Sequence, residues 1–357
     1  MEPVAGSYRA AGVDIDAAEA AKDEIATRVA ATHNVSVLRG VGLFGGFFRA
    51  PKSDGEVVLV ASADSVGTKV LVASLAGHHY PIGIDLVHHC VNDILACGAR
   101  PLFFLDYYAT PKLDPAALRE IIRGLTDACK DAGCALIGGE TAQLPGIYQP
   151  GTYDLAGFVV GAVKESRIID GSSIQDGDVV IGFPSSGLHT NGYSLARLAL
   201  GLDGDPNDAQ SKLTEPLDGS LSLTLKDLLL LPHRSYLPQI SPLLDLGIPQ
   251  GMAHITGGGI AGNVSRIIPD GLLAEFDLNS WVPDPIFSII QERGSISDDE
   301  MFKVFNMGIG FVVVVRPADV DRTLNEADEA RVVGRIVSAT DEANVRFVRN
   351  GDGWIAS

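Results

Sequence analysis

Residues 57–69, Val57-Val-Leu-Val-Ala-Ser-Ala-Asp64-Ser-Val-Gly67-Thr68-Lys69, join an apolar strand to a charged turn. The β-branched run predicts a buried strand that ends at Asp64. The turn contains Gly67 and presents Lys69, so an acid and a cation meet at one strand end. The spacing is not that of a Walker A loop, which needs a glycine five residues before its Gly-Lys-Ser/Thr group. A nucleotide held here would bind through acid-held magnesium rather than through a P-loop.

Length and composition bound the class of protein. A chain of 357 residues is too long for one compact core, which predicts two domains. The formal charge of −18, without a basic cluster, argues against a nucleic-acid surface. The longest aliphatic runs are far shorter than the ~20 residues of a membrane span. No secretion signal is expected, because the segment from Met1 has no charged start followed by an apolar core. The four cysteines form no CxxC pair and are expected to be buried thiols in a reducing cytoplasm.

The rest of the chain predicts a layered α/β fold in two halves. The division is expected between 167 and 168, giving an N-terminal domain over 1–167 and a C-terminal domain over 168–357, with 164–178 as the linker. Residues 201–216 are expected to form a surface loop. The predicted strands are 57–64, 102–106, 135–137, 155–163, 178–183, 311–315 and 332–338, and the predicted helices are 17–31, 84–97, 115–132, 193–200, 263–268 and 318–330.

A glycine-rich segment precedes the first strand. It reads Arg39-Gly-Val-Gly-Leu-Phe-Gly-Gly-Phe-Phe48. Glycine lets the backbone lie close to a ligand or flex over it, and it also supplies the positive φ of an ordinary hairpin. Both interpretations stay open from the sequence.

Three acids stand beside turns or helices that could position a metal ion. Asp64 ends a strand, Asp93 lies on the helix predicted over 84–97, and Glu140 follows Gly138-Gly139. Magnesium prefers oxygen ligands and keeps several waters, so a few carboxylates plus phosphate oxygens suffice to hold it. Each acid taken alone would more often be a helix cap or a surface charge.

The same helix carries Asp85, His89 and Asp93 at four-residue spacing, hence on one stripe. A transition-metal site is one interpretation of this stripe, but no cysteine or histidine from a third element obviously joins it. The alternative is that His88 and His89 pack or hydrogen-bond at the helix surface.

Two polar loops in the C-terminal half predict a phosphate site. Ser185-Ser-Gly-Leu-His-Thr-Asn-Gly192 places hydroxyls, an amide and His189 before a helix, and His254-Ile-Thr-Gly-Gly-Gly259 places three glycines before another. Free backbone N–H groups there favour a phosphate, and His189 could act as a proton carrier. The alternative is a pair of capped helices with a structural histidine. Two such loops in one domain favour a phosphorylated small molecule.

With these motifs in order, the chain resembles the family of aminoimidazole ribonucleotide synthetase (phosphoribosylformylglycinamidine cyclo-ligase), which acts in purine synthesis. Shorter acid–glycine motifs also occur across the wider ATP-binding superfamily that includes thiamine-phosphate kinase and selenide-water dikinase. The resemblance runs from Tyr8 nearly to the C-terminus, and its strings include Asp64–Lys69, Gly83–Leu86, Val91–Ile94, Leu102–Thr110, Gly138–Gly146, Tyr153–Gly157, Ile169–Gly171, Ser185–Ser194, His254–Gly259 and Phe305–Gly310.

The resemblance implies roles for matching residues. It implies catalytic roles for Lys69, Asp93 and His189, with Lys69 neutralising ATP phosphates, and metal binding by Asp64, Asp93 and Glu140. The nucleotide would lie against Asp64, Val66, Gly67, Thr68, Lys69, Asp93, Gly138, Gly139, Glu140 and Thr141. The phosphorylated ribonucleotide would lie against Ser185, Ser186, His189, Asn191, Thr256, Gly257 and Gly258.

The resemblance also implies cofactors and an assembly. ATP and Mg²⁺ are expected, with K⁺ left open as an accessory ion. The N-terminal sheet is expected to pair across a homodimer, and the C-terminal domain to be an α/β sandwich. Ser65 stands where the family usually has glycine, and Gln143-Leu144 replaces a more frequent Glu-Met. Leu188 and Thr190 replace Pro and Ser beside His189, which keeps the polar groups.

The expected reaction is an ATP-dependent ring closure that converts formylglycinamidine ribonucleotide to aminoimidazole ribonucleotide. Phosphoryl transfer depends on positioning and charge neutralisation, which suits magnesium carboxylates and a lysine better than a nucleophilic triad. A small-molecule kinase of the same superfamily would share the acids but use a different C-terminal pocket. A regulatory paralogue without turnover would be expected to lack Lys69 or Asp93, and both are present.

Overall fold

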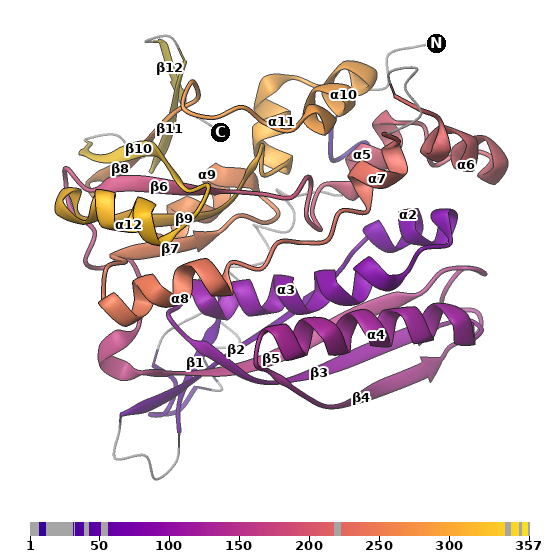
Figure 1. Cartoon of the computed structure of the whole chain (residues 1–357), viewed down its shortest axis with the longest axis horizontal. Coiled ribbons are helices and arrows are strands. Elements are labelled where there is room, and N and C mark those ends of the chain that lie inside the picture. The colour runs from indigo at the N-terminus through magenta and orange to yellow at the C-terminus, as the bar shows by residue number, and fades with distance from the viewer. Residues whose placement is uncertain are drawn as a thin grey trace.

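The structure is a computed structural model, and it describes residues 7–11, 31, 33–38, 43–50, 56–217, 223–339, 344–349 and 352–355. The described chain forms two mixed β-sheets with helices between and around them (Figure 1). The helix predicted over 17–31 lies outside the described residues apart from Ala31, and so do residues 39–42 of the glycine-rich segment.

The first sheet has five strands. Its order is β1 (Gly46–Arg49), β2 (Val57–Ser65), β5 (Asp154–Lys164), β3 (Arg100–Thr110) and β4 (Ala135–Gln143). Only β3 and β4 pair in parallel; the other pairs are antiparallel. Two helices, α3 (Tyr80–Ala96) and α4 (Pro115–Asp131), lie on one face, and no described helix covers the other (Figure 1).

Two glycines let α3 and α4 touch backbone to backbone. A Cβ on Gly83 would lie 2.1 Å from the carbonyl oxygen of Ile121, and one on Gly124 would lie 2.2 Å from that of Tyr80. Real Cβ atoms do not approach that closely, so only glycine permits this crossing. The close contact fixes α3 against the layer beneath it.

The second sheet has seven strands and a continuous core. Its order is β12 (Asp352–Ile355), β11 (Val345–Arg349), β8 (Leu272–Asp277), β10 (Arg331–Ser338), β6 (Val179–Pro184), β9 (Ile309–Val315) and β7 (Gly251–His254). All seven residues of β9 are buried, as expected for a strand covered on both faces. Only β11 and β8 pair in parallel. Both sheets are mixed, and the layered α/β fold expected from the sequence is confirmed; a mixed sheet was expected only for the N-terminal half.

Shorter helices surround this second sheet. They are α5 (Tyr193–Ala199), α6 (Pro206–Thr214), α7 (Leu225–Leu229), α8 (Leu237–Leu246), α9 (Gly259–Val264), α10 (Pro285–Gly294), α11 (Asp298–Val304) and α12 (Val320–Glu326), with α2 (Lys69–Ala76) belonging to the first half. The three 3₁₀ turns are η1 (Glu165–Arg167), η2 (Ser265–Ile267) and η3 (Pro317–Asp319).

Several sequence expectations are corrected here. The strand predicted over 135–137 continues to Gln143 as β4, so Gly138, Gly139 and Glu140 lie within a strand and not at a turn after it. Residues 201–216 are not simply a loop, because α6 forms within them: the Asp205 side chain caps its first turn and Pro206 starts it. The helix predicted over 263–268 begins earlier, at Gly259, and ends in the turn η2. The predicted strands over 57–64, 155–163 and 311–315 and the predicted helix over 115–132 are confirmed within two residues. The domain boundary at 167/168 stays a prediction.

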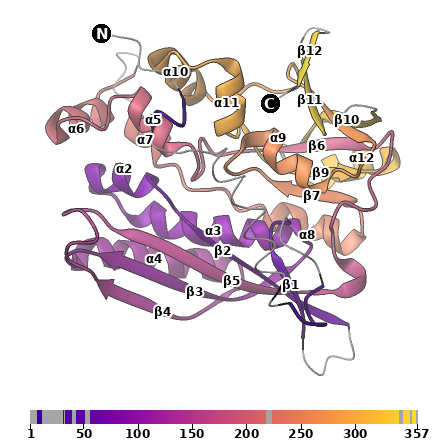
Figure 2. The same cartoon turned by 180° about the vertical axis from the view of Figure 1, so that it is seen from behind.

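Helix α3 lies between the two halves of the molecule. It contacts β2, β3 and β5 on one side and β7 and α8 on the other (Figures 1 and 2). Fourteen of its 17 residues are buried, including four that are polar or charged. Buried polar groups need partners, so this helix must exchange hydrogen bonds with the C-terminal half.

Two further expectations can be compared with the structure. Within the described residues, no helix has the length and apolar character needed to cross a bilayer. All four cysteines are buried and free, as predicted.

Candidate functional site

The polar stripe of α3 meets the C-terminal half through buried contacts. The Asn92 side chain donates to the carbonyl of Arg234 and accepts from the backbone N–H of Tyr236. Asp85 accepts from the backbone N–H of His233 at 2.7 Å. These bonds hold residues 233–236 against α3, so the two halves share one polar seam.

Lys69 is buried in this seam rather than presented at a surface. Its Nζ lies 2.8 Å from Oδ2 of Asp85, and neither side chain is exposed. It also donates to the carbonyls of His189 and Leu231 at 3.2 and 2.7 Å. Burial lowers the pKa of Lys69, and the Asp85 carboxylate opposes that change. An ammonium group has three donors, and these three acceptors occupy them. The turn therefore does not present Lys69 at a surface, and its role toward ATP phosphates stays a prediction.

Asp64 at the end of β2 faces His89 on α3. Its Oδ2 lies 2.6 Å from Nε2 of His89, and its side chain is 40% exposed while that of His89 is 2% exposed. On the other side of the ring, Nδ1 lies 2.5 Å from Oγ1 of Thr190. Burial alone would lower the pKa of His89, but the carboxylates of Asp64 and Asp93 outweigh burial and raise it to about 9. His89 is therefore an imidazolium at neutral pH.

Asp93 makes the equivalent contact with a histidine of the second sheet. Its Oδ1 lies 2.8 Å from Nδ1 of His254 at the end of β7, and its Oδ2 accepts from the Ser62 hydroxyl at 2.9 Å. Burial lowers the pKa of His254, although Asp93 opposes the shift. Nε2 of His254 in turn lies 3.0 Å from Nε2 of His233.

These contacts form one continuous path between the two acids. Oγ1 of Thr190 lies 3.4 Å from Nδ1 of His233, which closes the remaining gap. The path crosses between the halves twice. Helix α3 supplies His89 and Asp93, and the C-terminal half supplies the three residues between them. Its members in order are Asp64, His89, Thr190, His233, His254 and Asp93.

His189 lies beside this path in an unusual conformation. Its φ is +62°, a left-handed value that is uncommon outside glycine and that clusters at functional sites. Nε2 accepts from the backbone N–H of Ser186 at 3.1 Å, while the buried Nδ1 has no hydrogen-bond partner among the described residues. The ring stacks on His233 with centroids 3.9 Å apart. Burial lowers the pKa of His189 well below its usual value, so the ring is neutral.

The structure brings the two predicted phosphate loops together. A Cβ on Gly257 would lie 3.3 Å from Oδ1 of Asn191, so these two residues are neighbours. Ser185 of the first loop donates to Oδ1 of Asn306, just before β9, and Thr256 of the second loop donates to Oδ1 of Asn263 on α9. Gly258 has φ +94°, which suits glycine at the start of α9.

The predicted nucleotide-lining residues separate into two groups. Val66, Gly67 and Thr68 follow Asp64 at the seam, and Oγ1 of Thr68 lies 3.0 Å from Oγ of Ser194 on α5. The strand β4, with Gly138 to Thr141, lies three strands away from β2 at the edge of the sheet.

Within one chain the structure does not bring Glu140 to the other two acids. The residues directly opposite one another across β2, β5, β3 and β4 lie on the same face of the sheet. They are Asp64, Gly157, Asp106 and Gly139, and their face is the one that the helices cover. Successive side chains alternate between faces, so Glu140 points to the uncovered face.

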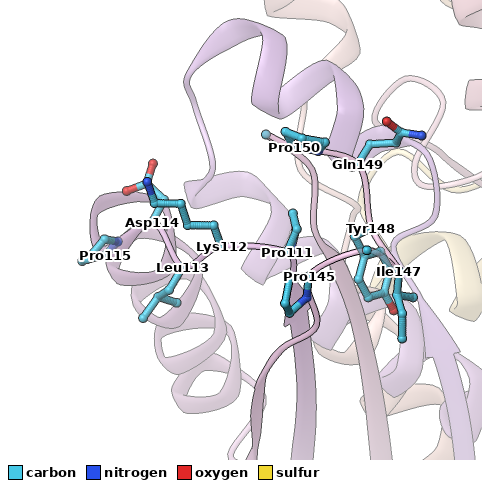
Figure 3. Close-up of a pocket in the computed structure, with 12 residues that line it drawn as sticks. Pro111, Lys112, Leu113, Asp114, Pro115, Pro145, Ile147, Tyr148, Gln149 and Pro150 are labelled. Carbon is cyan, nitrogen blue, oxygen red and sulfur yellow. The ribbon is translucent and has the colours of Figure 1, made fainter.

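A further cavity lies elsewhere. It has a volume of about 850 Å³ and is formed by the segments that follow β3 and β4 (Figure 3). Prolines, Ile147 and Tyr148 make it mainly apolar, and none of the predicted site residues lines it. It is a surface feature at the strand ends, separate from the histidine-rich seam.

Two histidines of this site were missed by sequence reasoning. His254 was noted only as the start of a glycine loop, and His233 was not noted. The metal interpretation of the α3 stripe was set aside because no third element supplied a ligand, yet His254 from β7 reaches Asp93. His89 is also buried rather than at the helix surface. The sequence of α3 contains one indication of these contacts. Apolar residues occur on every side of the helix, which implies that its polar residues are also buried and need partners.

The donor set at the seam is suited to a cation. One ligand atom each of His89, Asp93 and His254 lies within 4.8 Å of the others, and Asp64 contacts His89 directly. Two carboxylates from separate elements are a donor set that Mg²⁺ accepts. The partly exposed Asp64 gives the solvent access to these donors.

Comparisons with known proteins identify relatives of this chain. Family models described as "AIR synthase related protein", N-terminal and C-terminal domain, match residues 47–163 and 175–345. The phosphoribosylformylglycinamidine cyclo-ligase of Bifidobacterium animalis subsp. lactis is 45% identical over 341 residues, which cover 94% of this chain and 98% of that protein.

Two solved structures have a similar fold. The hydrogenase maturation protein HypE in complex with ATP has a TM-score of 0.64 at 17% identity, covering 84% of each chain. The thiamine-monophosphate kinase of Stenotrophomonas maltophilia has a TM-score of 0.59 at 19% identity, covering 92% of this chain and 95% of that one.

Proposed function

This chain belongs to the AIR synthase related family, and we propose from that premise that it is an ATP-dependent cyclo-ligase. It converts formylglycinamidine ribonucleotide to aminoimidazole ribonucleotide, with release of ADP and phosphate, in purine biosynthesis. The relative from Bifidobacterium carries the name of this activity and spans nearly the whole chain. The observation that carries the proposal is the seam itself, where His89 links Asp64 to Thr190, the neighbour of His189, and His254 binds Asp93.

The reaction needs an activated oxygen and an internal nucleophile. The formyl oxygen attacks the γ-phosphorus of ATP, the bond from that phosphorus to the β,γ-bridging oxygen breaks, and ADP is released. The formyl oxygen is then bonded to the transferred phosphoryl group. A nitrogen of the same substrate then attacks that carbon, the C–O bond breaks, and phosphate departs as the imidazole ring closes. The nitrogen loses a proton in this step, so the site needs a proton acceptor and exclusion of water.

We assign roles from the seam contacts. Asp64 and Asp93 would hold Mg²⁺, and the bound ion would neutralise the phosphate charge of ATP. His189 accepts the proton: its ring is neutral, and Nε2, its acceptor nitrogen, must give up the hydrogen bond from the Ser186 backbone N–H to take the proton. The loops with Ser185, Ser186 and Asn191, and with Thr256, Gly257 and Gly258, bind the ribonucleotide phosphate. An accessory K⁺ stays open.

Lys69 has a structural role that the family resemblance does not imply. Because it pairs with Asp85 and binds the His189 carbonyl, we propose that it holds the His189 loop in place. His189 is 1% exposed, so the two halves must part along α3 to admit substrate. Lys69 would then act as a positioning residue that restores the closed seam.

The predicted homodimer gives Glu140 and its strand a role. The first sheet exposes apolar side chains, with Phe158 45% exposed, Leu102 46% and Ile137 60%. Phe158 alternates with the buried Gly157 and Val159, so it lies on the uncovered face, and Glu140 lies on that face too. We propose that this face pairs with a second copy, that residues 138–141 reach ATP across the pair, and that the enzyme works in the cytoplasm.

An assay of the purified protein tests this proposal. With ATP, Mg²⁺ and formylglycinamidine ribonucleotide, ADP and aminoimidazole product should form in equal amounts. Asp93→Asn should lower turnover by about two orders of magnitude or more, whereas Asp131→Asn, an exposed acid on α4, should leave it unchanged. ADP formation without ring closure would indicate a small-molecule kinase and would contradict the proposal.

A further inference from the structure

We propose that His233 is a positioning residue, which holds the ring of His189 in place by stacking against it. The inference rests on the proposed function, in which His189 accepts the proton during ring closure. It assigns His233 a role that depends on the face of its ring and not on its nitrogens.

The two rings lie face to face. Their centroids are 3.9 Å apart, and the angle between their planes is 21°. Both side chains are buried. The hydrogens and lone pairs of imidazole nitrogens lie in the plane of the ring, so stacked rings cannot pass a proton directly to each other. His233 therefore acts on His189 through packing and charge, and it does not take the proton from it.

The ring of His189 depends on packing because few hydrogen bonds hold it. Nδ1 is buried without a hydrogen-bond partner among the described residues, and Nε2 accepts from the backbone N–H of Ser186. That bond must break when Nε2 takes up the proton. A Cβ on Gly310 of β9 would lie 2.4 Å from Cε1 of His189, so glycine leaves the room that the ring occupies. The stack on His233 stays in place while the proton is taken up.

Helix α3 of the first half fixes residue 233 through its backbone. Asp85 accepts from the backbone N–H of His233 at 2.7 Å, and Nδ1 of His88 donates to its carbonyl at 2.6 Å. One helix therefore binds both backbone polar groups of this residue. A ring attached to a backbone held in this way has little freedom to move off His189. The first half thus sets the orientation of a ring in the second half.

The ring nitrogens of His233 have partners near the plane of the ring. Nε2 lies 3.0 Å from Nε2 of His254, and Nδ1 lies 3.4 Å from Oγ1 of Thr190. These contacts fix the rotation of the ring and keep its face toward His189. Burial lowers the pKa of His233 well below its usual value, so the ring is neutral. It brings no second positive charge against His189 when that ring becomes an imidazolium.

Two substitutions separate the face of the ring from its nitrogens. His233→Phe keeps a flat ring and loses both hydrogen bonds, whereas His233→Gln keeps a polar amide and loses the ring. We expect His233→Phe to retain kcat within about threefold and His233→Gln to lower kcat about 10²-fold, because a misplaced reacting group costs that much. The KM for ATP should stay nearly unchanged in both variants. His78→Gln, a histidine outside the seam, is the matched control and should turn over as the parent does.

A double-mutant cycle tests whether the effect passes through His189. In the His189→Asn background there is no ring to stack on, so adding His233→Gln should change kcat less than about twofold. Circular dichroism of each variant confirms that the fold is retained. A full further loss of kcat in the double variant, or a kcat for His233→Phe as low as that for His233→Gln, would overturn the inference.

Nuclear magnetic resonance of protein labelled with ¹³C at histidine Cε1 tests the stack without turnover. The Cε1–H signal of His189, identified by its loss in His189→Asn, should lie upfield in the parent and in His233→Phe because of the ring current of the stacked neighbour. It should move downfield in His233→Gln, and an unmoved signal would overturn the inference even where the chain is an active cyclo-ligase. If the signal moves as expected but the parent forms no aminoimidazole product, the proposed function fails and the positioning of His189 by His233 stands.

Discussion

Nζ of Lys69 and Oδ2 of Asp85 lie 2.8 Å apart with neither side chain exposed. Lys69 begins α2 and Asp85 lies on α3, so the pair ties two helices of the first half together. The same ammonium binds the carbonyls of His189 and Leu231 in the second half. One buried ion pair therefore organises the seam that carries the site.

Removing one partner should be costly. Lys69→Met leaves the Asp85 carboxylate buried without its counter-charge, which typically costs about 3–5 kcal/mol of unfolding free energy. The double variant Lys69→Met/Asp85→Leu should regain most of that loss, because no unpaired charge is left. Urea unfolding of the three proteins measures both effects. Equal stability of the single and double variants would show that the pair is not coupled.

Stability should fall in mildly alkaline solution because of His89. Its pKa is about 9 in the folded chain and about 6.5 unfolded. A raised pKa stabilises the fold fully below pH 6.5, and that contribution is lost as the pH rises through 9. The pKa shift corresponds to a loss of about 3 kcal/mol in the free energy of unfolding. Thermal unfolding between pH 6 and 10 measures it.

The control for this pH profile is His89→Gln, which removes the titrating group. The variant should lose less stability than the parent across the same interval, whereas His78→Gln should follow the parent. A parent profile that is flat between pH 6.5 and 9 would contradict the ion pair with Asp64.

The uncovered face of the first sheet should mediate dimerisation. Phe158→Glu places a charge in that face and should convert the dimer to monomer at micromolar concentration, because burying an unpaired charge costs several kcal/mol. Val282→Glu, at an 87% exposed position, is the matched control and should stay dimeric. Sedimentation velocity separates the two species. A Phe158→Glu dimer would place the interface elsewhere.

Replacing His189 should affect chemistry more than nucleotide binding. Asn tolerates the left-handed backbone of this position, so His189→Asn keeps the fold while removing the proton acceptor. We expect kcat to fall by about 10²–10⁴-fold, with ATP affinity nearly unchanged by calorimetry. An undiminished kcat would remove the proposed role.

Local patterns of the sequence predicted about half of the described helices and strands. The strand over 57–64 and the amphipathic helix over 115–132 were predictable because their periodicity and ends lie within one stretch of chain. The strands β7 and β8 were not predicted: β7 has four residues, and β8 lacks a run of β-branched residues. Pairing with distant strands stabilises them, and no local pattern encodes that.

The site was predictable in its parts and not in its connections. Asp64, Asp93 and His189 were identified from their motifs, and the structure places all three at one seam. His233 was missed because a backbone hydrogen bond to Asp85 places it at the seam. The two residues are far apart in the sequence, so no local pattern indicates this contact. Lys69 was misjudged because a lysine after a turn is usually exposed, and only the tertiary packing shows it buried.

Oxygen labelling gives the most direct test of the proposed chemistry. Formylglycinamidine ribonucleotide labelled with ¹⁸O at the formyl oxygen is turned over with ATP, and the released phosphate is analysed by mass spectrometry. We expect the label in inorganic phosphate, one ¹⁸O for each ring closed, because the formyl oxygen leaves bonded to the transferred phosphorus. Label found in water with unlabelled phosphate would show that ATP does not activate that oxygen.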